Sequence, residues 1–422
     1  MAADAPRVAL RTLGCKVNRT ESEALAEALS GTCAVMMDAA DGADVVVVNT
    51  CTVTGEADAK ARKAVRHALG TGAAVVVTGC LAAVDPHGLE ALGPRVIVEP
   101  DRLTLPSTVA RVAGVTLAAG KTKSARPVPR GRTRVMVKVQ DGCDHRCSYC
   151  IVPDARGLPR SVPAAEVVER VEMLAAAGVP EVVLTGVNLG KYHDPRGVPD
   201  IGTLLRAVMA TSVTRVRISS IEPLDLDARL LEALASTTKL VPHLHVPLQS
   251  GCDRTLGEMG RGYTSADYCC VLDRARAALP GLSVTADVIA GFPGETDSDF
   301  AESLAFVERV GFTRMHVFRY SPRAGTPAAS RADQVPPAVK AARALALRDA
   351  SDRSCHEHAK GQVGSTVTAC VERVTGGRAR GTADDSLAFE TDAGTLHSGD
   401  VVRLRIEAAD SRGYRATVLE SL

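Results

Sequence analysis

Short apolar runs alternate with amphipathic stretches along the first hundred residues. The apolar runs have strand length and cover residues 8–13, 44–48, 74–78 and 95–98. Helical periodicity covers residues 21–29 and 56–69. Alternation of strand and helix is typical of a parallel sheet with helices packed on it. The pattern therefore predicts a doubly wound parallel α/β domain over residues 1–116.

The alternation stops at residues 117–134. Six basic side chains and no acidic one occur here, with Pro127, Pro129 and Gly131 among them. This composition is typical of a flexible linker. Its positive charges would also suit contact with nucleic-acid phosphates.

Strand and helix signals alternate again from residue 135 to about residue 322. The strand-like runs cover residues 135–139, 181–184, 215–219, 243–248, 283–289 and 315–320. Six βα repeats are fewer than the eight of a closed barrel, so we expect a partial (βα)6 barrel. A long helix over residues 337–360 starts at Pro336 and Pro337, where proline is tolerated. Barrel and helix together span residues 135–360.

The last segment, residues 361–422, changes character. Its short β-like runs are separated by glycine and aspartate. Such a pattern predicts a small antiparallel β-domain, either a barrel or a sandwich. From Val363 onward there are seven arginines and nine acidic residues, so the domain is not basic overall. Arg373, Arg378 and Arg380 form its one candidate stripe of positive charge.

Charge and composition narrow the class of protein. Fifty basic and forty-nine acidic side chains give a net charge of +1, which predicts neither a polyanion nor a membrane as partner from bulk charge. No apolar run approaches the roughly 20 residues of a membrane helix, and residues 1–6 lack signal-peptide features. The expected location is the cytoplasm. Twelve cysteines in a reducing compartment favour metal, cluster or catalytic roles over disulfides.

Three of these cysteines form a CxxxCxxC motif directly after the first strand of the predicted barrel. They are Cys143, Cys147 and Cys150. An electron-transfer iron–sulfur cubane takes four thiolates, so three thiolates leave one iron open to a small-molecule ligand. A zinc site is the alternative, and it would need a fourth ligand such as His145.

Three other cysteines each follow the carboxyl end of a predicted parallel strand. They are Cys15, Cys51 and Cys80, and each has a small glycine or threonine neighbour. Open α/β sheets bind their ligands at this edge, so the three thiols can converge in space. Buried structural cysteines are the alternative interpretation.

The CxxxCxxC motif at the mouth of a βα barrel resembles the signature of the radical S-adenosylmethionine (SAM) superfamily. The resemblance implies a [4Fe-4S] cluster on Cys143, Cys147 and Cys150 whose open iron chelates SAM. It also implies one-electron cleavage of SAM to a 5′-deoxyadenosyl radical, which removes hydrogen from an unactivated C–H bond.

Together with the N-terminal thiols, the motif resembles the methylthiotransferase family. That resemblance implies a second, auxiliary [4Fe-4S] cluster on Cys15, Cys51 and Cys80, and a C-terminal TRAM domain that binds RNA. It also implies cofactor contacts in the segments that match the family. The implied SAM-contact residues are Gly186, Ser220, Glu222, Gln249, Ile289, Gly291 and Tyr320. No residue is assigned a catalytic role.

Three activities are known in this family: methylthiolation of isopentenyladenosine in tRNA, of threonylcarbamoyladenosine in tRNA, and of an aspartate in a ribosomal protein. Residues 14–18, 140–143, 219–223 and 320–327 most resemble the threonylcarbamoyladenosine enzymes. The implied reaction is at C2 of N6-threonylcarbamoyladenosine 37, with the tRNA anticodon stem-loop as partner and flavodoxin or ferredoxin as a typical reductant. A structural iron–sulfur or zinc protein that binds RNA is the non-enzyme alternative.

Two histidine groups leave further alternatives open. His243 and His245 alternate on one predicted strand and so share a face, either as core residues or as residues that line the barrel. Cys355, His356 and His358 lie close together on the late helix and could bind a metal.

Overall fold

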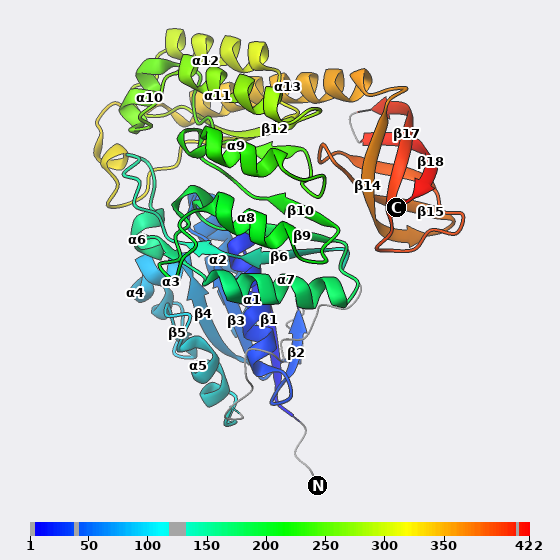
Figure 1. Cartoon of the computed structure of the whole chain (residues 1–422). Coiled ribbons are helices and arrows are strands. Elements are labelled where there is room, and N and C mark those ends of the chain that lie inside the picture. Colours follow the sequence, from blue (N-terminus) through cyan, green and yellow to red (C-terminus); the bar gives the residue numbers. More distant parts are fainter. Residues whose placement is uncertain (1–4, 38–41, 118–131, 411–412) are drawn as a thin grey trace. The chain divides into compact units, whose positions relative to one another are not determined.

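The computed structural model describes residues 5–37, 42–117, 132–410 and 413–422 (Figure 1). The linker predicted at residues 117–134 lies mostly outside these described residues. The chain forms two compact units, and the first combines residues 1–127 with 142–158 and 321–329. The second contains the remaining residues. The CxxxCxxC loop therefore belongs to the same compact unit as the N-terminal thiols.

A five-stranded parallel sheet forms the centre of the first unit, in the order β2-β1-β3-β4-β5. Its strands are β1 (Arg7–Thr12), β2 (Ala34–Met37), β3 (Val45–Thr50), β4 (Ala74–Gly79) and β5 (Val96–Val98). Its helices are α1 (Lys16–Leu29), α2 (Gly55–Gly70), α3 (Cys80–Val84), α4 (Pro86–Glu90), α5 (Leu105–Val112) and α6 (Val152–Arg156). This confirms the predicted α/β sheet.

Helices cover both faces of this sheet. On one face Val46 and Val48 of β3 pack with α2, and on the other Val45 and Val47 pack with α1 and α5. A strand that is buried on both sides has no polar face, which is why β3 is a continuous valine run. Each buried valine contributes about 1.5–3 kcal/mol.

Six parallel strands form the partial barrel of the second unit. They are β6 (Arg134–Lys138), β9 (Glu181–Thr185), β10 (Arg215–Ile218), β11 (His243–His245), β12 (Ser283–Ala290) and β13 (Arg314–Arg319). They pair in the orders β10-β9-β6 and β11-β12-β13. The parallel bridges Val216–Leu240 and Ser220–His245 connect the two halves. The short β7 (Gln140–Asp141) and β8 (Arg160–Ser161) form an antiparallel pair.

Helices follow the barrel strands, and their apolar faces share one core with them. They are α7 (Ala164–Ala176), α8 (Ile201–Met209), α9 (Ala228–Ala235), α10 (Asp253–Met259), α11 (Ser265–Ala278), α12 (Asp297–Val310) and α13 (Pro337–Gly361). Among the described residues, short 3-10 turns occur at Leu189–Lys191, Pro223–Asp225 and Pro327–Ser330. In the described part of the chain, none of the helices combines the length and apolar character needed to cross a bilayer.

The C-terminal strands close into a small barrel in the order β14-β15-β16-β18-β17. They are β14 (Thr366–Thr375), β15 (Arg378–Ala383), β16 (Ala388–Asp392), β17 (Val401–Asp410) and β18 (Gly413–Ser421). Four pairs are antiparallel, and the parallel pair β16–β18 completes the ring.

A buried ion network connects this small barrel to the amino ends of the large one. Glu181 accepts from Arg215 and Arg217, at 3.2 and 3.1 Å. Arg215 also reaches Asp384, in the turn between β15 and β16, at 2.6 Å. Burial raises the pKa of Glu181, but the arginine charges outweigh it and hold the pKa below its usual value. The two arginines are thus balanced by two carboxylates, as burial of charged groups requires.

Candidate functional site

The carboxyl edge of the N-terminal sheet carries three cysteines on neighbouring strands. Cys15 follows β1, Cys51 follows β3 and Cys80 follows β4, and these strands are adjacent in the sheet. In the strand order 2-1-3-4-5, the direction of winding reverses between β1 and β3. Cys15 and Cys51 therefore flank the position at which folds of this type bind their ligands.

Two glycines let the cysteine loops approach each other closely. A Cβ on Gly14 would lie 2.7 Å from the Cβ of Cys51, and one on Gly79 would lie 2.4 Å from the carbonyl oxygen of Thr50. Both glycines have positive φ, at +113° and +92°. Only glycine tolerates this conformation and this contact together. The loops of Cys15 and Cys80 therefore both close on the strand end that carries Cys51.

The three thiols affect one another electrostatically. The pKa of Cys80 is raised to about 11, chiefly by burial; the Arg156 guanidinium opposes this rise, and Cys51 and Cys15 add to it. Burial is also the main cause of the raised pKa of Cys51. All three cysteines are free, and Cys51 and Cys80 are buried while Cys15 is exposed. Cysteine thiols that are not in disulfides, with glycines next to them in the chain, are a donor set that suits an iron–sulfur cluster.

Asn18 orients the thiol of Cys15. Its Oδ1 accepts from the backbone N–H and from the thiol of Cys15, at 3.4 and 3.1 Å. Its Nδ2 donates to Asn49 Oδ1 at 2.9 Å and to the carbonyl of Thr50 at 3.0 Å. Asn18 is fully buried, so these bonds join the first turn of α1 to the end of β3.

Arg156 brings a positive charge to this edge from the segment that follows the CxxxCxxC motif. It donates to Glu21 Oε1 at 2.9 Å and to Asn18 Oδ1 at 3.4 Å. Its side chain is only 2% exposed. No local sequence pattern indicates the contact of Arg156 with Glu21, which lies 135 positions earlier.

The CxxxCxxC loop is closed at its base by backbone contacts. The N–H of Cys143 donates to the carbonyl of Gly157 at 3.0 Å, and a Cβ on Gly142 would lie 2.2 Å from the carbonyl oxygen of Leu158. The N–H of Cys150 donates to the carbonyl of Cys147, also at 3.0 Å, which makes the turn between them. Cys147 is buried, and Cys143 and Cys150 are half-buried.

The two cysteine triplets do not have the spacing of zinc ligands in the described part of the chain. Ligands of one tetrahedral zinc lie roughly 3.8 Å apart, given zinc–sulfur bonds of about 2.3 Å. Among the described residues, neither cysteine triplet forms a group of ligand atoms within 4.8 Å of one another, with or without His145. Cys355, His356 and His358 form no such group either, and His358 instead bonds Asp385 at 2.9 Å.

The seven predicted SAM-contact residues all lie at or beyond the carboxyl ends of barrel strands. Gly186 follows β9, Ser220 and Glu222 follow β10, Gln249 follows β11, Ile289 and Gly291 lie at the end of β12, and Tyr320 follows β13. Active sites of βα barrels lie at this end.

Gln249 adopts the left-handed backbone conformation, with φ of +70°. Its N–H donates to the carbonyl of Asp287 at 2.8 Å, and its carbonyl accepts from Ile289 at 2.9 Å. A non-glycine residue in this region costs of order 1–3 kcal/mol and often marks a functional site.

The side chains of Glu222 and Tyr320 both contact other side chains of the protein. Glu222 forms an ion pair with Arg261. The Tyr320 ring packs edge-on against Phe292, with 5.6 Å between ring centroids, and its carbonyl accepts from Lys340 at 3.3 Å. Contact between these side chains and SAM stays a prediction.

Comparison with known proteins agrees with this geometry. Residues 137–307 match the Radical SAM superfamily, and residues 7–98 match the Uncharacterized protein family UPF0004. The threonylcarbamoyladenosine tRNA methylthiotransferase MtaB of Bacillus subtilis (strain 168) is 38% identical over 368 residues, which cover 83% of this chain and 82% of the relative. The chain belongs to the radical SAM methylthiotransferase family. Its cofactors therefore include SAM and an iron–sulfur cluster.

Other relatives in this family have different printed names. The tRNA-2-methylthio-N(6)-dimethylallyladenosine synthase of Maricaulis maris (strain MCS10) is 31% identical over 451 residues, covering 100% of this chain and 99% of the relative. Among solved structures, the radical S-adenosylmethionine methyltransferase TsrM from Kitasatospora setae has a TM-score of 0.55 at 17% identity. It covers 77% of each chain, and this likeness shows the fold alone.

Single replacement of Cys143, Cys147 or Cys150 by alanine should abolish reductive cleavage of SAM, because two protein thiolates would not hold the cluster in a form that binds SAM. The measurement is formation of 5′-deoxyadenosine under anaerobic reductant. Cys270→Ala, at an exposed cysteine of α11, is the matched control. Wild-type rates in a CxxxCxxC variant would contradict the assignment of these three ligands.

Proposed function

We propose that the chain transfers a methylthio group to C2 of N6-threonylcarbamoyladenosine 37 in tRNA, using two [4Fe-4S] clusters. The observation that carries this proposal is the convergence of Cys15, Cys51 and Cys80 at one sheet edge, in a chain whose barrel carries CxxxCxxC. The names and identities of the MtaB relatives support the substrate. Dimethylallyladenosine in tRNA is the competing substrate, because the Maricaulis relative aligns over the full chain.

Cys143, Cys147 and Cys150 would hold the cluster that binds SAM, and Cys15, Cys51 and Cys80 would hold the auxiliary cluster. When bound, the first cluster supplies the electron that converts SAM to the 5′-deoxyadenosyl radical. With three protein thiolates each, both clusters would have one iron without a protein ligand, which could bind SAM in the first and the transferred sulfur in the second.

The surrounding residues orient these ligands. Asn18 holds the Cys15 thiol, and Arg156 adds positive charge beside Cys51 and Cys80, which favours their thiolate forms. Gly186 provides space at the end of β9, where an added Cβ would lie 3.0 Å from the side chain of Gln140. We propose that SAM lies against this glycine and the strained Gln249.

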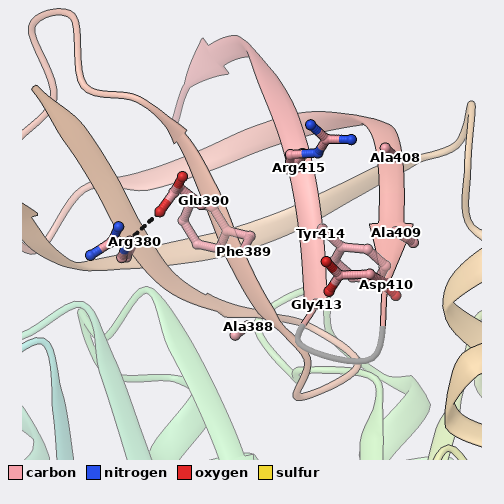
Figure 2. Close-up of a pocket in the computed structure, with 10 residues that line it drawn as sticks. All are labelled: Arg380, Ala388, Phe389, Glu390, Ala408, Ala409, Asp410, Gly413, Tyr414 and Arg415. Atoms are coloured by element: carbon pink, nitrogen blue, oxygen red, sulfur yellow. Dashed lines mark hydrogen bonds and ion pairs between the residues drawn. The ribbon is translucent and has the colours of Figure 1, made fainter.

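The C-terminal barrel is the proposed tRNA-binding domain. A cavity of about 360 Å³ opens between β16, β17 and β18 (Figure 2). It is lined by Arg380, Ala388, Phe389, Glu390, Ala408, Ala409, Asp410, Gly413, Tyr414 and Arg415. Arg378 and Arg380 both pair with Glu390, at 3.0 and 2.5 Å, so part of the predicted basic stripe is neutralised. Arg415 adds a further positive charge from β18.

The remaining expectations complete the proposal. The proposed domains along the sequence are residues 1–116, 135–360 and 361–422, with a linker between the first two, although residues 142–158 and 321–329 pack in the compact unit of the first. The partner is the anticodon stem-loop of tRNA, the electron donor is a flavodoxin or ferredoxin, and the compartment is the cytoplasm, where tRNA is modified.

Replacement of Cys15, Cys51 and Cys80 together by alanine should leave SAM cleavage intact and eliminate methylthiolated tRNA. Loss of the auxiliary cluster removes the sulfur donor but not the cluster that binds SAM. The readouts are 5′-deoxyadenosine formation and mass spectrometry of tRNA nucleosides. The double variant Cys269→Ala, Cys270→Ala is the matched control.

Circular dichroism must first show that the triple variant is folded, since Cys51 and Cys80 are buried. A folded triple variant that still makes methylthiolated tRNA would refute the role of these thiols in sulfur delivery.

Arg156→Met should lower the midpoint potential of the auxiliary cluster, because a buried positive charge favours the reduced state. The ion pair with Glu21 offsets part of this charge, so the expected shift is on the order of tens of millivolts. Potentiometry monitored by electron paramagnetic resonance would measure it in a background that lacks Cys143, Cys147 and Cys150. Arg156→Lys should preserve the potential, and an equal potential in Arg156→Met would show that the guanidinium charge has no influence.

Arg415→Glu should weaken tRNA binding and reduce the slope of log affinity against log salt by about 1, as expected for the loss of one phosphate contact. SAM cleavage should not change. Arg353→Glu, an equal charge change on the exposed face of α13, is the control. Deletion of the whole domain is a poorer test because it would expose Arg215 and Glu181. If Arg415→Glu has the same tRNA affinity and the same salt slope as the wild type, tRNA does not contact this cavity.

A further inference from the structure

Three metal-ligating side chains meet on neighbouring strands of the large barrel. They are His245 on β11, Asp287 on β12 and His316 on β13. One ligand atom from each lies within 4.8 Å of the other two. His245 Nε2 lies 3.3 Å from Asp287 Oδ1, and the two histidine rings are 5.6 Å apart between centroids. It is the one such group in the described part of the chain.

Strand register produces this meeting. Asp287 pairs with His316, and His245 pairs with Thr285, two residues earlier along β12. Side chains in strands alternate between faces, so Thr285 and Asp287 project away from the helices. Val284, Ala286 and Val288, on the opposite face, belong to the core that the helices cover. The three ligand residues therefore line the inside of the barrel.

A hydroxyl group orients the buried histidine. Thr285 Oγ1 lies 3.0 Å from His245 Nδ1 and 3.2 Å from His243 Nε2. When His245 Nδ1 carries the proton and donates it to Thr285, Nε2 directs its lone pair at the Asp287 carboxylate. Nitrogen and oxygen ligands at about 2.0–2.1 Å from one tetrahedral zinc ion lie roughly 3.3 Å apart, which is the distance between these two atoms. Ligand histidines commonly use their second nitrogen in this way, to bond a group that fixes the tautomer.

We propose that His245, Asp287 and His316 bind a divalent transition-metal ion such as Zn²⁺, separately from the iron–sulfur clusters. Two imidazoles and one carboxylate are a ligand set of such ions, and three protein ligands leave a fourth position open. Asp287 lies two residues before Ile289 on β12, so the site lies roughly 6.6 Å below the predicted SAM-contact layer. His245 is buried, Asp287 half-buried and His316 exposed, so the ion has access from one side. The open position suits an oxygen donor.

Zinc binding to the tag-free holoenzyme tests this proposal. Both clusters are first reconstituted, free metal is removed with a chelator, and Zn²⁺ is titrated by calorimetry. One zinc per chain should bind in addition to the cluster iron. X-ray absorption at the zinc edge should show nitrogen and oxygen ligands at about 2.0–2.1 Å and no sulfur at about 2.3 Å. This readout does not depend on methylthiotransferase activity, so it stands apart from the proposed function.

His316→Gln should weaken zinc binding at least about 10-fold, because even groups that only support a ligand contribute that much. His316 is exposed, which makes it the ligand whose replacement disturbs the fold least. Asp287→Asn should have the same effect, and His397→Gln, at an exposed histidine of the C-terminal barrel, should have none.

Three results would overturn the proposal. The first is a holoenzyme, with both clusters reconstituted, that binds no zinc. The second is zinc with sulfur ligands, which would place the ion on the cysteines. The third is equal zinc affinity in folded His316→Gln, folded Asp287→Asn and the wild type.

Discussion

The chemistry of this chain depends on one geometric constraint: neighbouring parallel strands end at the same edge of a sheet. In the N-terminal sheet this edge gathers Cys15, Cys51 and Cys80 from segments far apart in the sequence. Gly14 and Gly79 then let the loops of Cys15 and Cys80 close on the end of β3, because any side chain there would meet Cys51 or Thr50.

Charge is the second constraint, and Arg156 supplies it. The residue lies a few positions after the CxxxCxxC motif and contacts Glu21 and Asn18 beside the N-terminal thiols. A change in the CxxxCxxC loop that moved α6 would therefore also change the field at the auxiliary thiols. A separate ion pair, between Arg323 and Asp58 at 2.7 Å, connects residues 321–329 to the segment after Cys51.

Much of this arrangement could be predicted from the sequence where the signal is local. The valine run of β3, the proline start of α13 and the position of each cysteine after a strand all depend on neighbouring residues. The shared face of His243 and His245 followed from their alternation. The partners of His245 could not be predicted, because Asp287 and His316 come from strands whose register depends on tertiary packing. The contact of Arg156 with Glu21 was missed for the same reason.

The most direct test of the central claim is the reaction itself with defined tRNA. The reconstituted holoenzyme is incubated with SAM and reductant, and with tRNA that carries either N6-threonylcarbamoyladenosine or isopentenyladenosine at position 37. Nucleosides are then analysed by mass spectrometry. We expect the 2-methylthio product from the threonylcarbamoyladenosine tRNA only. SAM cleavage without methylthiolation of either tRNA would contradict the proposed function, and product from the isopentenyladenosine tRNA alone would contradict the substrate.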